Sequence, residues 1–266
     1  MRIFSGPGLR YLGLSLLCLN LAFVAVGPAY ATKTARAYIT VIIDDLGVDW
    51  ANGLEAIRLP GPVAVAVIPN RAYSTRLALR AHGERKDVLL HLPMEPVELK
   101  DLLPADGLRT DMSEKEIYRS VEVGLASVPN AIAINNHMGS EFTSSKRAMS
   151  RLMAAVRAQN PELFFVDSLT TSESVVRQQA TAYGIQTLAR SVFLDNERSE
   201  EAIEKQFDEL LSIARKYGGA IAIGHPFPET LAVLQRRLAP LSEGEVRLIP
   251  ITMLMAMKIQ GQGPWR

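Results

Sequence analysis

Polar side chains with catalytic or metal-binding chemistry follow short apolar runs at several points in this sequence. They are Asp44, Asp45, His91, Asn135, Asn136, His137, Asp167, Asp195, Asn196 and His225. If the apolar runs are parallel strands, their carboxyl ends share one rim, and these distant residues would meet in one pocket. Any one of them could instead cap a following helix. That explanation is weak for the whole set, which includes three of the four histidines.

These residue types suit a hydrolytic metal site. A catalytic zinc usually has three protein ligands and an open position for water, and Asp45, His91 and His137 could supply the three. A nearby carboxylate could take a proton from water, and a histidine opposite could protonate the leaving group. Asp44 and His225 are the candidates for base and acid. The expected cofactor is therefore a divalent metal, with zinc as the first choice.

The two adjacent aspartates need not be redundant. Neighbouring residues of a strand point to opposite sides, but at a strand end the backbone can turn and bring both side chains into one site. Asp45 would then stay ionised as a ligand, while Asp44 remains free to act as base. The alternative is that the pair only forms a strand-end turn closed by Gly47.

Eight apolar, β-branched runs are candidates for the strands that would position these residues. They span residues 38–43, 63–68, 88–90, 131–134, 163–166, 191–194, 220–223 and 246–249. Short runs of continuous apolarity are typical of strands that are buried on both faces, as in a parallel sheet. The carboxyl end of each such strand would present the polar residues that follow it.

Amphipathic stretches of helical period lie between these runs. They span residues 113–128, 145–159, 171–183, 199–217 and 228–238. Ser113 precedes Glu116 by three residues, which is the spacing of a capping box. The alternation predicts an α/β fold in a single domain, a parallel (β/α) barrel of seven or eight strands. An open doubly wound sheet is the alternative, but no Gly-x-Gly-x-x-Gly or Gly-x-x-x-x-Gly-Lys motif supports its nucleotide-binding forms.

Residues 1–31 have the pattern of a secretory signal peptide. An apolar run at residues 11–26 follows Arg10, and Ala-Tyr-Ala at residues 29–31 fits the small-x-small cleavage rule. We therefore expect a barrel domain at residues 32–266 that is exported to the periplasm or the cell exterior, without a stable membrane span after cleavage. An uncleaved anchor is the alternative, since the run lies near the lower length limit for a bilayer span.

Charge and cysteine content exclude several classes of protein. The chain has 29 basic and 28 acidic residues, and this balance gives no indication of a nucleic-acid partner. The single cysteine, Cys18, lies in the predicted signal peptide. The exported domain would therefore contain no disulfide, and any metal site in it must use oxygen and nitrogen ligands.

Six motifs, taken in order, resemble the divergent polysaccharide deacetylase family of the glycoside hydrolase/deacetylase superfamily. They are Ile-Ile-Asp-Asp-Leu-Gly (42–47), His-Leu-Pro-Met-Glu-Pro (91–96), Asn-Asn-His-Met-Gly-Ser (135–140), Asp-Ser-Leu-Thr (167–170), Phe-Leu-Asp-Asn (193–196) and Gly-His-Pro (224–226). The resemblance spans residues 37–255 and implies a distorted (β/α) barrel with metal-dependent deacetylase activity. It also implies that Asp44 is the base, Asp45 a metal ligand and His225 the general acid.

The second motif departs from the deacetylases to which this family is similar. Those enzymes complete the metal site with two histidines four residues apart, whereas His91 is followed at that spacing by Glu95. The third ligand is therefore either Glu95 or His137, which comes from another strand. We favour His137, because Pro93 and Pro96 oppose a regular helix that would place His91 and Glu95 on one face.

Three functions are open from the sequence. The first is a metal-dependent hydrolase that removes acyl groups from an extracytoplasmic polysaccharide or oligosaccharide, with peptidoglycan as one candidate substrate. The second is a metal-independent glycoside hydrolase, in which Asp44, Asp167 or Asp195 would act as an acid and base pair. The third is a glycan-binding envelope protein without turnover. Residues that could extend the site are Glu95, Asn136, Asp167, Ser168 and Asp195.

Overall fold

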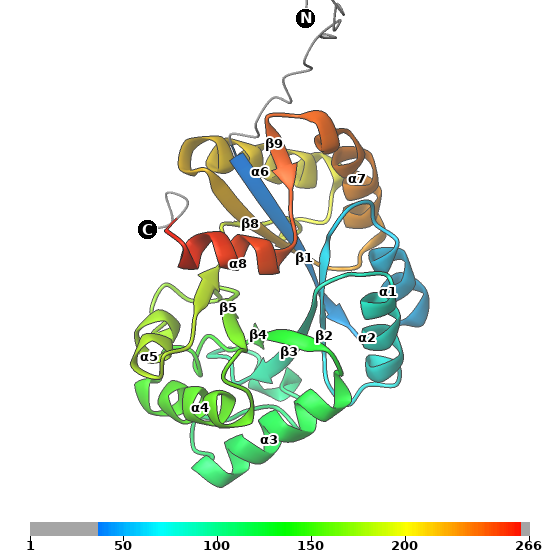
Figure 1. Cartoon of the computed structure of the whole chain (residues 1–266). Coiled ribbons are helices and arrows are strands. Elements are labelled where there is room, and N and C mark those ends of the chain that lie inside the picture. The colour runs from blue at the N-terminus through cyan, green and yellow to red at the C-terminus, as the bar shows by residue number, and fades with distance from the viewer. Residues whose placement is uncertain (1–36, 262–266) are drawn as a thin grey trace, which may run out of the picture. The chain divides into compact units, whose positions relative to one another are not determined.

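The computed structural model of this chain describes residues 37–261, apart from the side chains of residues 242 and 243. The predicted signal peptide, residues 1–31, lies outside this range and stays a prediction. The described residues form one compact unit. Within the described range, strands and helices alternate along the chain, and the helices surround the strands (Figure 1). The predicted α/β fold is confirmed.

One curled sheet, in which every described strand pair is parallel, forms the centre of the domain. Its strands are β1 (Ala37–Leu46), β2 (Ala64–Val67), β3 (Val88–Met94), β4 (Ala131–Met138), β5 (Phe164–Asp167), β6 (Thr187–Ala189), β7 (Val192–Phe193), β8 (Gly219–Gly224) and β9 (Val246–Leu248). The order is β6-β5-β4-β3-β2-β1-β8-β7, and β9 pairs with β1. Each of the eight predicted runs overlaps a strand, and β6 is additional.

The two outer strands of the sheet, β6 and β7, are consecutive in the chain. Only Arg190 and Ser191 separate them, yet β6 pairs with β5 and β7 pairs with β8. One short extended segment therefore crosses from one end of the sheet to the other, so the sheet curls round on itself. This arrangement confirms the predicted distorted (β/α) barrel and explains its irregularity.

Eight α-helices lie in the described range, together with two short 3-10 helices. They are α1 (Trp50–Ile57), α2 (Ser74–Gly83), α3 (Glu114–Ser127), α4 (Lys146–Gln159), α5 (Val176–Ala182), α6 (Glu200–Tyr217), α7 (Pro228–Leu238), α8 (Ile251–Ile259), η1 (Lys100–Leu102) and η2 (Ala239–Glu243). The five predicted helices correspond to α3–α7. The capping box between Ser113 and Glu116 is present at the start of α3.

Alternate side chains of β1 divide the core into two parts. Val41 and Ile43 belong to the larger apolar cluster, which also contains the buried faces of the helices. Ile42 points the other way, into a smaller cluster built from the inward side chains of the strands. Burial on both sides of the strand explains why its sequence is continuously apolar rather than alternating.

Helix α8 closes the end of the barrel at which the strands begin. Its residues Ile251, Leu254 and Met255 pack into the inner apolar cluster. The backbone N–H and hydroxyl of Thr252 donate to Asp87, which directly precedes β3, at 3.0 and 2.9 Å. The opposite end, where the strands finish, is therefore the end at which polar side chains can gather.

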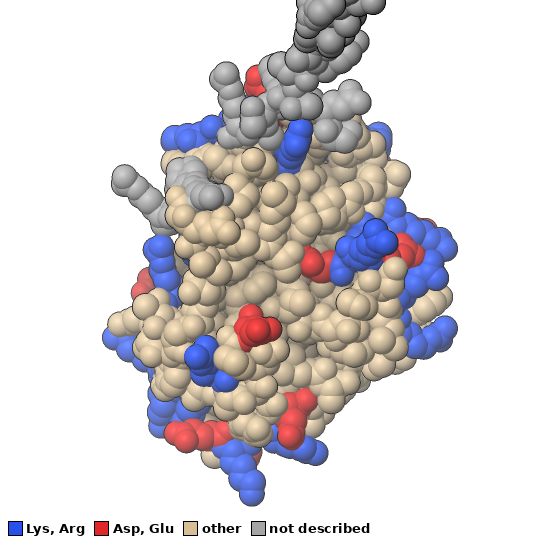
Figure 2. All heavy atoms as spheres, in the orientation of Figure 1, with Lys and Arg blue, Asp and Glu red and all other residues tan. Residues whose placement is uncertain are grey.

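The surface of the domain has charged groups of both signs. On the face shown in Figure 2, Lys and Arg lie near Asp and Glu around the edge, and the centre has few charged side chains. No helix between residues 37 and 261 has both the length and the apolar character that a membrane span requires.

Candidate metal centre

The carboxyl end of β1 brings two adjacent aspartates into one site. The strand pairs regularly with β2 at Ile42 and Ile43, and the register shifts before Leu46. Asp45 has a φ of 61°, in the left-handed region that Asp enters more readily than most residues. The side chain of Asp44 points into the barrel interior, as does that of Ile42. Without the turn, the side chain of Asp45 would point toward the helices, as does that of Ile43.

Asp45, His91 and His137 bring three potential ligand atoms together at this end of the barrel. The atoms all lie within 4.8 Å of one another. Oδ1 of Asp45 is 3.1 Å from Nε2 of His91 and 2.8 Å from Nδ1 of His137. The imidazoles, from β3 and β4, meet edge to face with their centroids 5.0 Å apart. We call these three residues the ligand cluster.

The ligand cluster fits a divalent cation. Oδ1 of Asp45 is buried, and although two ring nitrogens lie close to it, no described group has the geometry to give it a hydrogen bond. Buried carboxylate oxygens normally have such a partner. One carboxylate oxygen and two imidazole nitrogens are also a common ligand set for zinc and similar divalent ions. Asp45, His91 and His137 are therefore the residues that would hold the ion.

The two aspartates differ in their affinity for protons. Burial works to raise the pKa of the Asp45 carboxyl, but the adjacent His137 and His91 rings outweigh it and hold that pKa well below its ordinary value. For Asp44, burial prevails and raises the pKa of the carboxyl, although His91 and His225 oppose it. A pair of carboxyl groups with diverging pKa values is the arrangement expected for two different roles.

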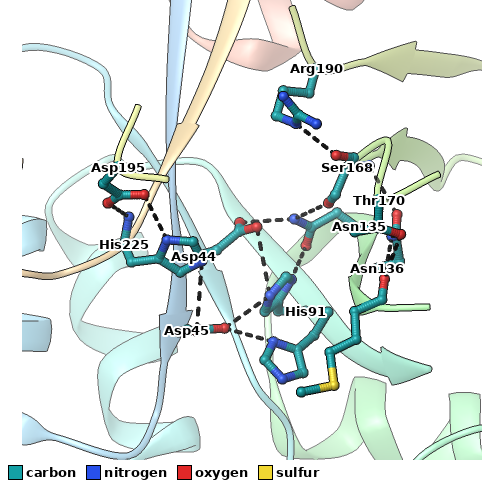
Figure 3. A network of polar contacts seen from close by, with 12 residues as sticks. Asp44, Asp45, His91, Asn135, Asn136, Ser168, Thr170, Arg190, Asp195 and His225 are labelled. Atoms are coloured by element: carbon teal, nitrogen blue, oxygen red, sulfur yellow. Dashed lines mark hydrogen bonds and ion pairs between the residues drawn. The ribbon is translucent and has the colours of Figure 1, made fainter. Parts of the chain in front are cut away.

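Asn135 of β4 connects Asp44 to His91. Nδ2 of Asn135 donates to Oδ1 of Asp44 at 2.9 Å, and Oδ1 of Asn135 is 2.9 Å from Nδ1 of His91 (Figure 3). In the sequence, Asn135 is recognisable only as a strand-end residue, and Asn136 is the predicted site residue. Alternation along the strand was the signal that could have identified Asn135, because it lies on the same face as His137.

His225, directly after β8, is held by Asp195. Oδ2 of Asp195 accepts the backbone N–H of His225 at 2.6 Å, and Oδ1 lies 2.9 Å from the ring Nδ1. Burial would lower the pKa of His225, but the bond to Asp195 and the charge of Asp45 raise it to about 9. Nε2 of His225 is 3.7 Å from Oδ2 of Asp45. A protonated ring nitrogen therefore faces the ligand cluster.

Glu95, the alternative third ligand, is not part of the ligand cluster. Its Oε2 accepts the backbone N–H and the hydroxyl of Thr110 at 2.8 and 2.9 Å, and its Oε1 accepts from Nζ of Lys100 at 3.1 Å. Both oxygens therefore hold the loop that follows β3. Because β3 continues as a strand to Met94, the helical spacing between His91 and Glu95 does not arise.

Asn136 joins the ends of β4 and β5. Its Oδ1 accepts the backbone N–H of Ser168 at 2.9 Å, and its Nδ2 donates to the carbonyl of Met138 at 2.7 Å. The hydroxyl of Ser168 is 3.5 Å from Nδ2 of Asn135, and its carbonyl accepts from Nε of Arg190 at 2.7 Å (Figure 3). Asn136 thus supports the rim, and Ser168 reaches the edge of the network.

Asp167 stabilises the loop between β5 and α5. Its Oδ1 accepts the backbone N–H of Leu169 at 2.9 Å, and its Oδ2 accepts the hydroxyl of Ser174 at 2.6 Å. The same hydroxyl accepts the backbone N–H of Val176, the first residue of α5, at 3.3 Å. The sequence pattern predicted a helix from residue 171. These bonds explain why α5 instead begins at Val176.

A polar hollow of about 920 Å³ lies between α6 and the residues around β7, and neither the ligand cluster nor Asp44 nor His225 lines it. Ser168, Thr170, Arg190 and Phe193 are among the residues that line it. The ring of Phe193 meets the imidazole of His225 edge to face, with centroids 5.3 Å apart. The volume lies within the range of small-molecule sites, and hydroxyl, guanidinium and aromatic groups are suited to binding a sugar.

A curled parallel (β/α) barrel, with carboxylates and histidines gathered where its strands end, defines a polysaccharide deacetylase-like protein. The chain belongs to the divergent polysaccharide deacetylase family, whose model matches residues 41–255. It is 37% identical over 216 residues to the protein YibQ of Escherichia coli (strain K12), a match that covers 81% of this chain and 66% of that protein.

Two solved structures resemble the fold. The uncharacterized protein ATU2773 from Agrobacterium tumefaciens C58 superposes with a TM-score of 0.78 at 23% identity, over 82% of this chain and 89% of that one. A variant of the peptidoglycan deacetylase PdaC from Bacillus subtilis superposes with a TM-score of 0.54 at 11% identity, over 85% of this chain and 94% of that one. At these identities the likeness shows the shared fold.

Proposed function

We propose that this chain is an exported, metal-dependent deacetylase that removes acetyl groups from an extracytoplasmic polysaccharide, with zinc as its metal. The observation that carries the proposal is the ligand cluster, with Asp44 on one side of it and His225 near the other oxygen of Asp45. One site thus offers a place for a cation, a carboxylate able to accept a proton and an imidazolium able to donate one.

The ligand cluster would hold the ion through Oδ1 of Asp45, Nε2 of His91 and Nδ1 of His137. A divalent ion bound there would supply Lewis-acid chemistry, polarising the acyl carbonyl and lowering the pKa of water. The depressed pKa of Asp45 keeps its carboxylate ionised and ready to bind a cation. Zinc is the expected ion, because two imidazoles and one carboxylate suit it.

Asp44 and His225 would move the protons of the reaction. Asn135 donates a hydrogen bond to Oδ1 of Asp44 and leaves Oδ2 free of that contact. Oδ2 accepts one proton from water as the oxygen of that water bonds to the acyl carbon. Nε2 of His225 donates its proton to the sugar nitrogen or oxygen as the bond from that atom to the acyl carbon breaks. The products are acetate and a free amine or hydroxyl. Exchange with solvent then returns Asp44 and His225 to their starting states.

Three observations support the substrate and the location. The family is named for polysaccharide deacetylation, and the solved structure of PdaC is that of a peptidoglycan deacetylase with the same fold. The polar hollow is lined by Phe193, whose ring meets that of His225, and it has room for a sugar. Export rests on the signal-peptide pattern of residues 1–31.

The glycoside hydrolase alternative has less support. It requires a free acid and base pair on opposite sides of a sugar. Asp195 is bonded to His225 and Thr230, and Asp167 is bonded to Leu169 and Ser174, so both carboxylates already have partners.

The experiment is a metal and product analysis of the protein after expression of the full chain. Protein purified from the cell envelope should contain one divalent ion per chain by elemental analysis, begin near residue 32 and release acetate from N-acetylated peptidoglycan or chitin fragments. A chelator should stop the release, and added zinc should restore it. Protein that contains no divalent metal and gains none on incubation would contradict the mechanism. New reducing ends without acetate would indicate glycoside hydrolysis instead.

A further inference from the structure

Asn135 is a completely buried amide between two groups that the proposed mechanism uses for different purposes. It is the register partner of His91 in the parallel pairing of β3 with β4. Register partners project from the same side of a sheet, so both side chains point into the barrel. Asp44 reaches the same point from the end of β1 (Figure 3). The amide therefore contacts two other strands at once.

The direction of both contacts follows from which atoms can donate. The amide nitrogen Nδ2 of Asn135 faces Oδ1 of Asp44 at 2.9 Å, and it can only donate. The amide oxygen then faces His91, and because this oxygen can only accept, Nδ1 of His91 must hold a proton. In the neutral ring, a proton on Nδ1 leaves Nε2, the atom that faces Asp45, with a free lone pair. That is the form of imidazole that binds a metal.

We propose that Asn135 is a positioning residue that couples the metal ligand His91 to the base Asp44 through a single amide group. The inference rests on the proposed function and adds a residue to it. The amide oxygen selects the tautomer and the ring orientation of His91. The amide nitrogen donates a hydrogen bond to Oδ1 of Asp44. Oδ2 is therefore the oxygen that remains to receive a proton from water. Metal affinity and proton transfer thus depend on opposite ends of one side chain.

The chemistry of an amide is what this position requires. Leu has the same branched arrangement of heavy atoms but offers neither a donor nor an acceptor, so both contacts would be lost. Asp retains an acceptor for Nδ1 of His91 but replaces the donor to Asp44 with a second carboxylate oxygen, where the present separation is 2.9 Å. The two substitutions therefore separate the two contacts.

Asn136 is a matched control. It is the next residue of β4, it is 1% exposed, and its amide also makes a contact through each end. Its partners, Ser168 N–H, the Met138 carbonyl and the Thr170 hydroxyl, belong to the rim and include neither His91 nor Asp44. An Asn136→Ala variant therefore removes a buried amide of the same strand and leaves the proposed coupling in place.

The test compares wild type, Asn135→Leu, Asn135→Asp and Asn136→Ala at one alkaline pH, with zinc affinity measured by calorimetry and acetate release measured separately. Asn135→Leu should weaken zinc binding by about 10- to 100-fold, the usual effect of removing a partner that orients a ligand. Asn135→Asp should keep zinc affinity within a few-fold of wild type but lower kcat by about 100-fold or more. Asn136→Ala should lower Tm and leave zinc affinity unchanged.

The split between affinity and turnover is the decisive result. If Asn135→Asp loses zinc affinity and kcat in parallel, or loses neither, Asn135 does not couple the two groups and the inference is overturned while the deacetylase proposal stands. Should Asn135→Leu fail to fold, Asn135→Asp still decides the question, since it keeps the size and polarity of the side chain. Wild-type protein that binds no zinc would overturn the proposed function and this inference together.

Discussion

Nε2 of His91 lies between the carboxylates of two adjacent residues, 3.6 Å from Oδ2 of Asp44 and 3.1 Å from Oδ1 of Asp45. The turn at Asp45 creates this relationship, because it lets consecutive side chains face one imidazole from different directions. The two carboxylates can therefore approach one imidazole nitrogen from different sides and take different roles. Substitutions at the two aspartates should consequently have different effects.

Asp45→Asn should remove metal binding. Asn also tolerates the left-handed backbone at this position, so the fold should persist while the negative charge of the ligand is lost. Removing a residue that only orients a ligand typically weakens binding by about 10- to 100-fold, and loss of a ligand should exceed that range. Titration calorimetry with zinc is the measurement. Unchanged affinity would show that Asp45 does not bind the metal.

Asp44→Asn should leave the metal in place and stop turnover. The variant keeps the size of the side chain but has no carboxylate to accept a proton from water, so kcat should fall by about 100- to 10,000-fold. Acetate release and zinc content should be measured on the same sample. Loss of zinc in proportion to activity would mean that Asp44 is itself a ligand.

Asp195→Asn should impair the step that depends on His225. The neutral side chain can no longer stabilise the imidazolium, whose pKa is raised to about 9, and kcat should fall by about 100-fold with KM little changed. Asp87→Asn is the control, since Asp87 caps α8 at the opposite end of the barrel. A similar loss of kcat in both variants would indicate a general effect on folding.

Glu95→Gln should lower stability in a pH-dependent way without affecting the metal. Burial works to raise the pKa of Glu95, but hydrogen bonds from Thr110 and Lys100 outweigh it and hold the pKa below its ordinary value of 4.5. A lowered pKa in the folded state contributes stability above pH 4.5, and this contribution disappears as the pH falls through the folded-state pKa.

Urea unfolding at several pH values measures this effect. At neutral pH the Glu95→Gln variant should be less stable than wild type by about 1–2 kcal/mol. The difference should shrink as the pH falls below 4.5. Zinc affinity should be the same in both proteins. A large loss of affinity would mean that Glu95, and not only the ligand cluster, contacts the ion.

Gly139→Ala should destabilise the rim beneath His137. Gly139 has a φ of 92°, and a Cβ there would lie 2.9 Å from Cβ of Met94. Gly184→Ala is a matched control, because its φ is 66° but nothing lies within 4 Å of the added Cβ. Gly184→Ala should cost about 1 kcal/mol for the backbone alone, and Gly139→Ala should cost more. Equal unfolding free energies would exclude the contact with Met94 as a cause.

Local pattern in the sequence was enough to predict the architecture. Continuous apolar runs such as residues 38–43 indicate strands that are buried on both faces, and the helical stretches between them require parallel connections. Polar residues directly after these runs then fall at one end of the barrel. Asp45, His91 and His137 could be selected for this reason, and the structure brings their ligand atoms together.

Strand β6, which was not predicted, shows the limit of prediction from local sequence pattern. Residues Thr187–Ala189 are too few to give a periodic signal, and they form β6 only because β5 offers a free edge beside them. Two residues further along the chain, β7 pairs with β8 at the other end of the sheet. Pairing partners of this kind are set by the closure of the whole sheet, which no short stretch of sequence describes.

The sequence by itself determined that a barrel forms and that its polar residues collect where the strands finish. Only the tertiary structure decided which of them meet: His137 lies against Asp45, whereas Glu95 is bonded to Thr110 and Lys100. It also showed which groups the two asparagines contact: Asn135 contacts Asp44 and His91, whereas Asn136 contacts Ser168. The reason is physical, since strand register and the backbone turn at a strand end set the direction of each side chain, and both depend on contacts between segments that are distant in the chain.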